Sequence, residues 1–156
     1  GVNISDGATN VMPVGPHRPA AGEYLSAEQD RENVEAVRRA WKLHYGHATH
    51  SLVNGFYQGW DLHPAQLPTR YGAGYAFFLG GLPSATARLK NFIEKAAQAT
   101  LAGDVFDDAA TGQGLLNYFL RARNCGAITE AEASATGLTP AEFASRSFLK
   151  ILEGRR

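Results

Sequence analysis

Cysteine is almost absent from this chain of 156 residues, which carries a single one, Cys125. One cysteine excludes an internal disulfide and suits a reducing compartment. Long apolar runs are missing too, because no stretch is long enough to span a membrane and no signal peptide opens the chain. We therefore expect a cytoplasmic protein without a membrane partner.

An excess of charge of one sign is also lacking, since Lys plus Arg and Asp plus Glu number 15 each. This balance gives no reason to expect nucleic acid or an acidic surface as a partner. Internal repeats and low-complexity tracts are missing as well. The hydrophobic content of 44% and the charged content of 19% are typical of a soluble globular protein, and the length suits one ordinary domain.

The densest chemistry lies between Gly55 and Gln66. Residues 60–62 are short and apolar-flanked, as the end of a strand is. Pro64 would stop that strand, because proline cannot donate a hydrogen bond to a ladder. His63 would then stand at the carboxyl end of the strand, where active sites lie in α/β folds. The alternative is a strand and turn with a packed histidine.

The first half of the chain predicts a strand, a helix and this second strand. Residues 1–5 alternate and predict the first strand. Asp6 follows directly, either as a functional carboxylate or as a residue that shapes a turn. A capping box predicts a helix from Ser26, and Gly46 is its natural end. The buried stripe of this helix is expected to contain Val34, Val37 and Trp41.

The second half is expected to be helical. The best linker candidate is Gly80-Gly81-Leu82-Pro83, which would divide the chain into regions 1–80 and 81–156. Hydrophobic spacing predicts helices over residues 84–101 and around residues 115–120. Two further capping boxes predict helices that begin at Thr129 and Thr139. The last of these helices is expected to bury Phe143, Phe148, Ile151 and Leu152.

Two groups invite a ligand interpretation. His44, His47 and His50 recur at intervals of three, but Gly46 interrupts them and nothing nearby completes the four ligands that structural zinc usually takes. Surface or capping histidines are therefore favoured over a zinc site. Arg70 could meet an anionic ligand, since its fork suits carboxylate and phosphate, or it could be solvated.

The segment from Gly55-Phe56 to Leu62-His63-Pro64-Ala65-Gln66 resembles the last barrel strand of the HpcH/HpaI aldolase and citrate lyase β-subunit family, whose pattern is Gly-Phe-x-Gly-Lys-x-x-Ile-His-Pro-x-Gln. Gln58-Gly59 stands in place of the family's Gly-Lys pair, so the lysine is missing. Other parts of residues 1–125 resemble the seventh strand, the helices around the last strand, and the lid segment around Val105-Phe106-Asp107. The resemblance implies an α/β protein, namely the last two strands of a (β/α)₈ TIM barrel at 1–80 and a helical lid or oligomerisation region at 81–156.

The resemblance also implies a function, namely carbon–carbon bond cleavage or aldol addition on a keto acid or an acyl-CoA-type substrate through an enolate. It implies a catalytic Asp107 on the lid and substrate-binding residues His63, Gln66 and, more weakly, Asp6. The divalent metal, usually Mg²⁺, would be held by carboxylates upstream of this chain, so no metal ligand is assigned here. A homo-oligomer or the remainder of the barrel is the expected partner, beside the small-molecule substrate, for which a coenzyme A thioester is one candidate.

Two further hypotheses stay open. A chain with so much amphipathic helix could be a non-enzymatic interaction module, and the histidines could belong to a small zinc-binding protein. Asp107 and Asp108 precede a predicted helix, so one of them could simply cap it. Two strands cannot shield their own edges, so the barrel interpretation predicts a fragment of a longer protein.

Overall fold

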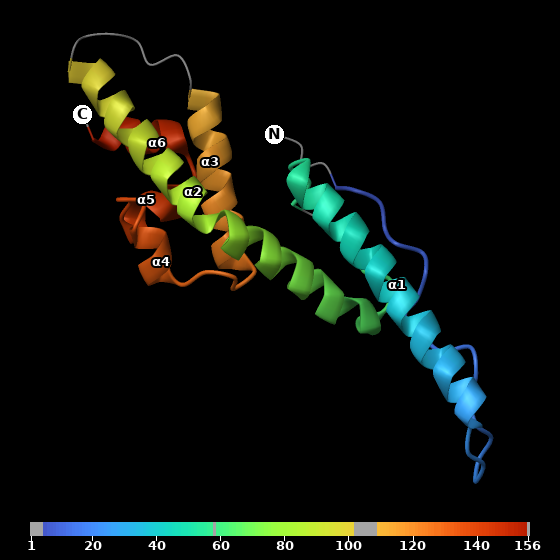
Figure 1. Ribbon diagram of the computed structural model, residues 1–156. Coiled ribbons are helices and arrows are strands. Elements are labelled where there is room, and N and C mark those ends of the chain that lie inside the picture. The colour runs from blue at the N-terminus through green and yellow to red at the C-terminus, as the bar shows by residue number, and fades with distance from the viewer. Residues whose placement is uncertain (1–4, 58, 102–108, 156) are drawn as a thin grey trace. The chain divides into compact units, whose positions relative to one another are not determined.

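The structure is a computed structural model that describes residues 5–57, 59–101 and 109–155. The chain divides into two compact units, Gly1–Gly74 and Tyr75–Arg156, and the second helix contributes residues to both. In the described ranges, no helix is both long and apolar enough to cross a membrane. The helical elements are α1 (Ala27–Val53), η1 (Pro64–Gln66), α2 (Leu67–Leu101), α3 (Ala109–Asn124), α4 (Glu130–Ser134), α5 (Pro140–Ser145) and α6 (Phe148–Gly154) (Figure 1).

The predicted barrel fragment is wrong, because the described residues contain helices and no strand or sheet. The expected strand at residues 60–62 is irregular. The backbone N–H of Leu62 donates to the side-chain Oε1 of Gln66 at 2.8 Å. In a β-sheet this N–H would instead donate to the carbonyl of a neighbouring strand. The other expected strand, residues 1–5, lies outside the described residues except for Ser5.

Helix α1 begins where the capping box predicts, but it does not end at Gly46. Ser26 and Gln29 exchange side-chain and backbone hydrogen bonds across the first turn. The helix continues through Gly46 to Val53, and the chain then turns at Gly55 with φ of 81°. The expected stripe is largely exposed, since Val34 is 47% and Trp41 38% exposed. The buried face is instead formed by Ala40, His44, Ala48 and Ser51.

The segment before α1 runs antiparallel along that helix. Asp6 bonds to the Ser51 hydroxyl near the end of α1. Farther along the segment, the His17 N–H donates to Asn33 Oδ1 at 2.9 Å, and the Asn33 amide returns a bond to the His17 carbonyl. Side-chain bonds to a helix face therefore hold a stretch that has no regular secondary structure of its own.

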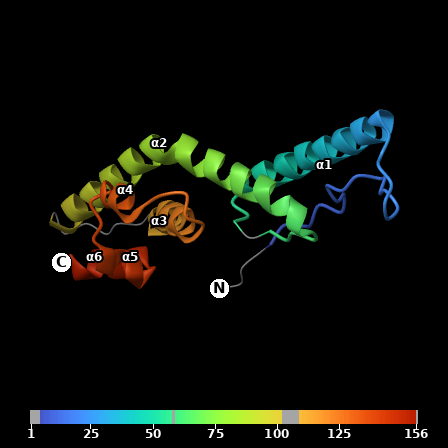
Figure 2. The ribbon, with the colours of Figure 1, turned by 90° about the horizontal axis from the view of Figure 1, so that it is seen from below.

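The expected linker at residues 80–83 lies inside α2, which is one helix of 35 residues (Figures 1 and 2). A packing contact accounts for Gly81, because a side chain there would collide with the hydroxyl of Tyr118. That hydroxyl donates to the Phe78 carbonyl at 2.6 Å. Pro83 cannot donate the next helical hydrogen bond, yet the packing keeps the helix continuous.

The core of the C-terminal unit is built from α2, α3 and the short C-terminal helices. Helices α3 and α6 are in close contact, since a side chain at Gly112 would overlap the Phe148 ring. The Phe148 ring also lies 5.6 Å from that of Phe92. The buried residues include Leu89, Ile93, Ala96, Leu116, Phe119, Ala122, Phe143, Phe148 and Ile151.

The two C-terminal capping boxes are confirmed, at Thr129 and Thr139. The helix that begins after Thr139 is shorter than expected, because α5 ends at Ser145. Arg146 adopts a left-handed conformation with φ of 54°, and Ser147 then caps α6. A residue at positive φ cannot continue a right-handed helix, so the expected single helix becomes two.

Candidate functional site

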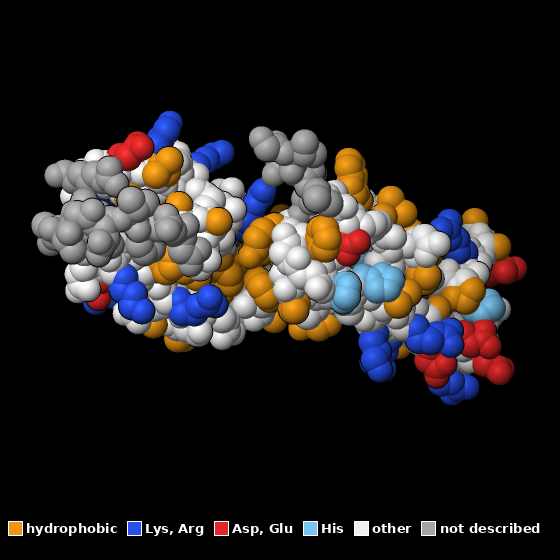
Figure 3. All heavy atoms as spheres, turned by 90° about the horizontal axis from the view of Figure 1, so that it is seen from above, with side chains coloured by type: hydrophobic (Ala, Val, Ile, Leu, Met, Phe, Trp, Pro, Cys, Tyr) orange, Lys and Arg blue, Asp and Glu red, His pale blue; other side chains and the backbone are white. Residues whose placement is uncertain are grey.

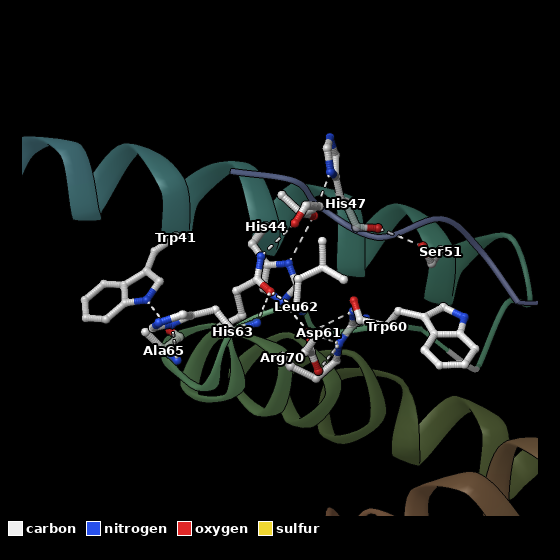
Figure 4. Close-up of polar contacts among 12 residues, drawn as sticks. Trp41, His44, His47, Ser51, Trp60, Asp61, Leu62, His63, Ala65 and Arg70 are labelled. Atoms are coloured by element: carbon white, nitrogen blue, oxygen red, sulfur yellow. Dashed lines mark hydrogen bonds and ion pairs between the residues drawn. The ribbon is translucent and has the colours of Figure 1, made fainter. Parts of the chain in front are cut away.

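A polar cluster lies in the N-terminal unit where the first segment, α1 and the start of α2 meet (Figure 4). Its members are Thr9, His44, His47, Asp61 and Arg70, and we refer to them as the His44 cluster. His44 and His47 lie three residues apart on α1, which places them on neighbouring parts of one helix face. Histidine side chains also reach the surface of this unit (Figure 3).

The Thr9 hydroxyl joins the two histidines. Its Oγ1 lies 3.1 Å from Nδ1 of His44 and 2.9 Å from Nδ1 of His47. Thr9 is 3% exposed and His44 1%, whereas His47 is exposed. The contact therefore runs from the protein interior to the surface through one hydroxyl group.

Asp61 and Arg70 stand on the other side of His44. Asp61 Oδ1 lies 3.0 Å from His44 Nε2, but the approach does not have hydrogen-bond geometry, so this contact is electrostatic. Arg70 Nε donates to both oxygens of Asp61, at 3.1 and 3.3 Å. The Arg70 guanidinium also packs closely over Gly59, where a side chain would have to displace it.

The proton positions in this cluster follow from charge and burial. Burial lowers the pKa of His44, the positive charge of Arg70 lowers it further, and Asp61 opposes both. His44 is therefore neutral at pH 7 and carries one ring proton. The Asp61 carboxylate favours that proton on Nε2, so Nδ1 accepts the Thr9 hydroxyl proton. The Thr9 oxygen can then accept Nδ1–H from His47.

Gln66, expected to bind substrate, is 0% exposed and is bonded to backbone at both ends of its amide. Oε1 accepts from the N–H groups of Leu62 and His63, at 2.8 and 3.3 Å. Nε2 donates to the carbonyls of Thr9 and Val11, at 2.9 and 3.5 Å. The side chain therefore ties the segment before η1 to the first segment of the chain.

His63 and Asp6 have local partners as well. His63 caps η1, since its Nδ1 accepts from the Ala65 N–H at 3.1 Å. Asp6 accepts from the Ser51 hydroxyl and from the Gly7 N–H, and these two bonds lower the pKa of its carboxyl. Among the substrate-binding predictions, the structure thus places His63 and Gln66 next to each other, and Asp6 beside the end of α1. Asp107, the predicted catalytic residue, lies outside the described residues.

The sequence identified parts of the cluster but not the whole. The pattern indicates His44 and His47 as possible ligands and leaves Arg70 either at an anion or solvated, but it does not indicate the pairing of Thr9 and Asp61 with them. In the described ranges, no group of three or more His, Cys, Asp or Glu side chains could hold a metal ion. That result concerns His44, His47 and His50, whereas the carboxylate ligands of magnesium were expected upstream of this chain. The available signal was the spacing of three between two histidines on one helix.

The comparisons with known proteins give one result. A family model described as "Domain of unknown function (DUF6986)" matches residues 1–151. No curated protein and no solved structure matches the chain.

Proposed function

The chain belongs to the DUF6986 family, whose description assigns no activity, and we propose that it serves in a carbon–carbon lyase or aldolase. The substrate would be a keto acid or an acyl-CoA-type compound that reacts through an enolate. The observation that carries the proposal is the Thr9 hydroxyl bonded to both His44 and His47. The resemblance of residues 55–66 to the HpcH/HpaI aldolase and citrate lyase β-subunit family gives the reaction class.

Enolate formation requires a base beside the carbon that loses its proton. Imidazole suits this role, because its charge changes near neutral pH. His47 is exposed and is bonded through Nδ1, so its Nε2 would take the proton from carbon and return it to the product or to solvent. Thr9 and His44 would act as positioning residues that hold His47 in the required tautomer.

The roles of Asp107, His63 and Asp6 come from the family resemblance alone. Asp107 would act as the second acid or base. His63 and Asp6 would contact the substrate, and Gln66 would serve by holding the backbone around His63. Any divalent metal would be held by carboxylates upstream of this chain, so the steps assigned here are those of this chain's own side chains.

The proposal is tested by the exchange of the methyl protons of pyruvate in D₂O, followed by proton NMR with the full chain. We expect the wild-type chain to accelerate the exchange above the buffer rate and His47→Gln to lose roughly 10²–10⁴-fold of that acceleration. His50→Gln removes an exposed histidine of the same helix and is the matched control. Circular dichroism checks that each variant is folded.

Two outcomes would count against the proposal. If the wild-type chain leaves the exchange rate equal to that in buffer, the proposed enolate formation is refuted and the helical interaction module is favoured. A folded His47→Gln variant with the wild-type rate would show that the bonds to Thr9 only anchor the first segment to α1.

A further inference from the structure

A hollow of about 600 Å³ lies in the C-terminal unit, and none of its lining residues belongs to the His44 cluster. It is framed by the end of α3, the approach to α4, and α5 with the residue that follows it. Its volume lies within the range of small-molecule sites, roughly 300–1,000 Å³. The lining combines apolar side chains, including Leu120, Ile128 and Phe143, with the charged side chains of Arg123, Glu130 and Arg146.

Arg123 is held in place on one wall of this hollow. Its guanidinium carbon lies 5.1 Å from the centroid of the Phe143 ring, and its Nη2 pairs with the Glu130 carboxylate. A cation over an aromatic face is attracted by the ring, so this position is stabilised from two sides. Arg123 and Glu130 also neutralise each other's charge.

Arg146 supplies a further positive charge at this hollow. In the part of the chain that the structure describes, its guanidinium forms no ion pair and no side-chain hydrogen bond. Its backbone is the one non-glycine position with positive φ among the described residues, at 54°. The conformation is sustained from α3, because Gln113 donates to the Arg146 carbonyl at 3.2 Å and accepts from the Phe148 N–H at 2.8 Å.

A non-glycine residue at positive φ is strained, and such residues gather at functional sites. Glycine would fit the backbone of this helix end better, as it does at most left-handed caps. Arg146 therefore places a long charged side chain at the hollow although its backbone conformation favours glycine. A guanidinium without an ion pair among the described residues, beside apolar walls, matches a ligand with one negative charge and an apolar body.

We propose that this hollow is a binding site for a small organic monocarboxylate. The Arg146 guanidinium would bind the carboxylate through two parallel N–H···O bonds, which its fork geometry favours. The apolar body of the ligand would lie against Leu120 and Ile128. The site is independent of the proton transfer proposed for His47.

The test is an NMR titration of the ¹⁵N-labelled full chain with hexanoate and with benzoate. We expect saturable shifts of the amide signals of Arg123, Ile128, Glu130, Phe143 and Arg146. Hexanol and benzyl alcohol, which lack the charge, and inorganic phosphate, which lacks the apolar body, should bind at least roughly tenfold more weakly.

Arg146→Gly removes the guanidinium and relieves the backbone strain, so the variant should fold at least as well as the wild type. It should bind both carboxylates roughly tenfold or more weakly, as expected for loss of a charged hydrogen-bonded pair. Lys150→Gln, which removes an exposed positive charge of α6, should bind as the wild type does. The proposal is overturned if neither carboxylate binds, if the shifts lie elsewhere, if phosphate or the alcohols bind equally well, or if Arg146→Gly binds normally.

Discussion

Among the single residues of this protein, His44 shows most directly how burial and charge compete. Its Nε2 lies close to a carboxylate that favours the protonated ring, while burial and the guanidinium of Arg70 favour the neutral ring. The pKa of His44 is lowered, so the latter two effects prevail. The side chain therefore serves as a neutral link between Asp61 and Thr9.

We expect the His44 imidazole to titrate below its ordinary value of 6.5. A folded pKa below the unfolded one means that the unfolded chain binds the proton more readily. The contribution to stability is therefore complete above pH 6.5 and is lost as the pH falls through the folded pKa. The proton NMR signals of the histidine rings, followed against pH, measure this midpoint. A value above 6.5 would mean that Asp61 outweighs burial and Arg70.

Glu142 contrasts with His44, because its surroundings favour the charged form and not the neutral one. Its hydrogen bonds from Arg155, and those from the N–H and hydroxyl of Thr139, lower the pKa of Glu142 to about 2 in spite of its partial burial. Its contribution is present above the ordinary value of 4.5 and is lost as the pH falls toward 2.

Glu142→Gln should destabilise the C-terminal unit by about 2 kcal/mol at pH 7, the usual range for a hydrogen bond to a charged group. The difference from the wild type should shrink between pH 4.5 and pH 2. Urea unfolding followed by circular dichroism at several pH values measures it. Glu153→Gln, an exposed change in α6, should have little effect, and an equal loss in both variants would contradict the role of Arg155.

At the scale of the helices, the starts marked by capping boxes were predictable from sequence, whereas other boundaries were not. The helix expected over residues 84–101 ends at Leu101 as predicted but begins at Leu67. A capping box is satisfied within four residues, so Ser26, Thr129 and Thr139 marked three helix starts correctly. An end depends on what the next residues contact. Gly46 did not end α1, and Arg146 ended α5 although no glycine or proline stands there.

The incorrect strand prediction has a related cause. Residues 60–62 have the composition of a strand, but a strand needs a partner, and the Leu62 N–H is bonded to the side chain of Gln66 instead. The candidate site was only partly predictable for the same reason. His44 and His47 are neighbours on one helix, whereas Thr9 reaches them from 35 and 38 residues away. Such a pairing leaves no periodic signal in the sequence.

Two glycines of α3 predict opposite effects for the same substitution. A side chain at Gly112 would overlap the Phe148 ring, whereas the space around Gly114 is open. Gly112→Ala should therefore destabilise the unit by about 1–3 kcal/mol, because the packed ring must move. Gly114→Ala should stabilise it by up to about 1 kcal/mol through helix propensity. Thermal unfolding of both variants decides this, and equal shifts would refute the contact between α3 and α6.

At the scale of the whole chain, the two units carry separate cores and separate probes. Both tryptophans, Trp41 and Trp60, belong to the N-terminal unit, whereas most of the short helices belong to the C-terminal unit. Tryptophan fluorescence therefore reports the first unit, and the helical circular dichroism signal reports both.

We expect variants to shift these two signals separately. Gln66→Leu leaves backbone groups around Leu62 and Thr9 without partners, so it should lower the free energy of unfolding followed by fluorescence by about 2 kcal/mol or more. Gly112→Ala should lower the circular dichroism midpoint and leave the fluorescence midpoint nearly unchanged. Urea titrations with both detectors test this, and coincident shifts in each variant would show that the chain unfolds as one cooperative unit.

The continuity of α2 has a kinetic consequence. Gly80, Gly81 and Pro83 together disfavour helix by about 5 kcal/mol relative to alanine, and they are concentrated within four residues. Helix growth from either end would stall at this turn until Tyr118 is in position to bond the Phe78 carbonyl. The middle of the longest helix would then be one of the last parts of the chain to form, and its closure would require the docking of α3.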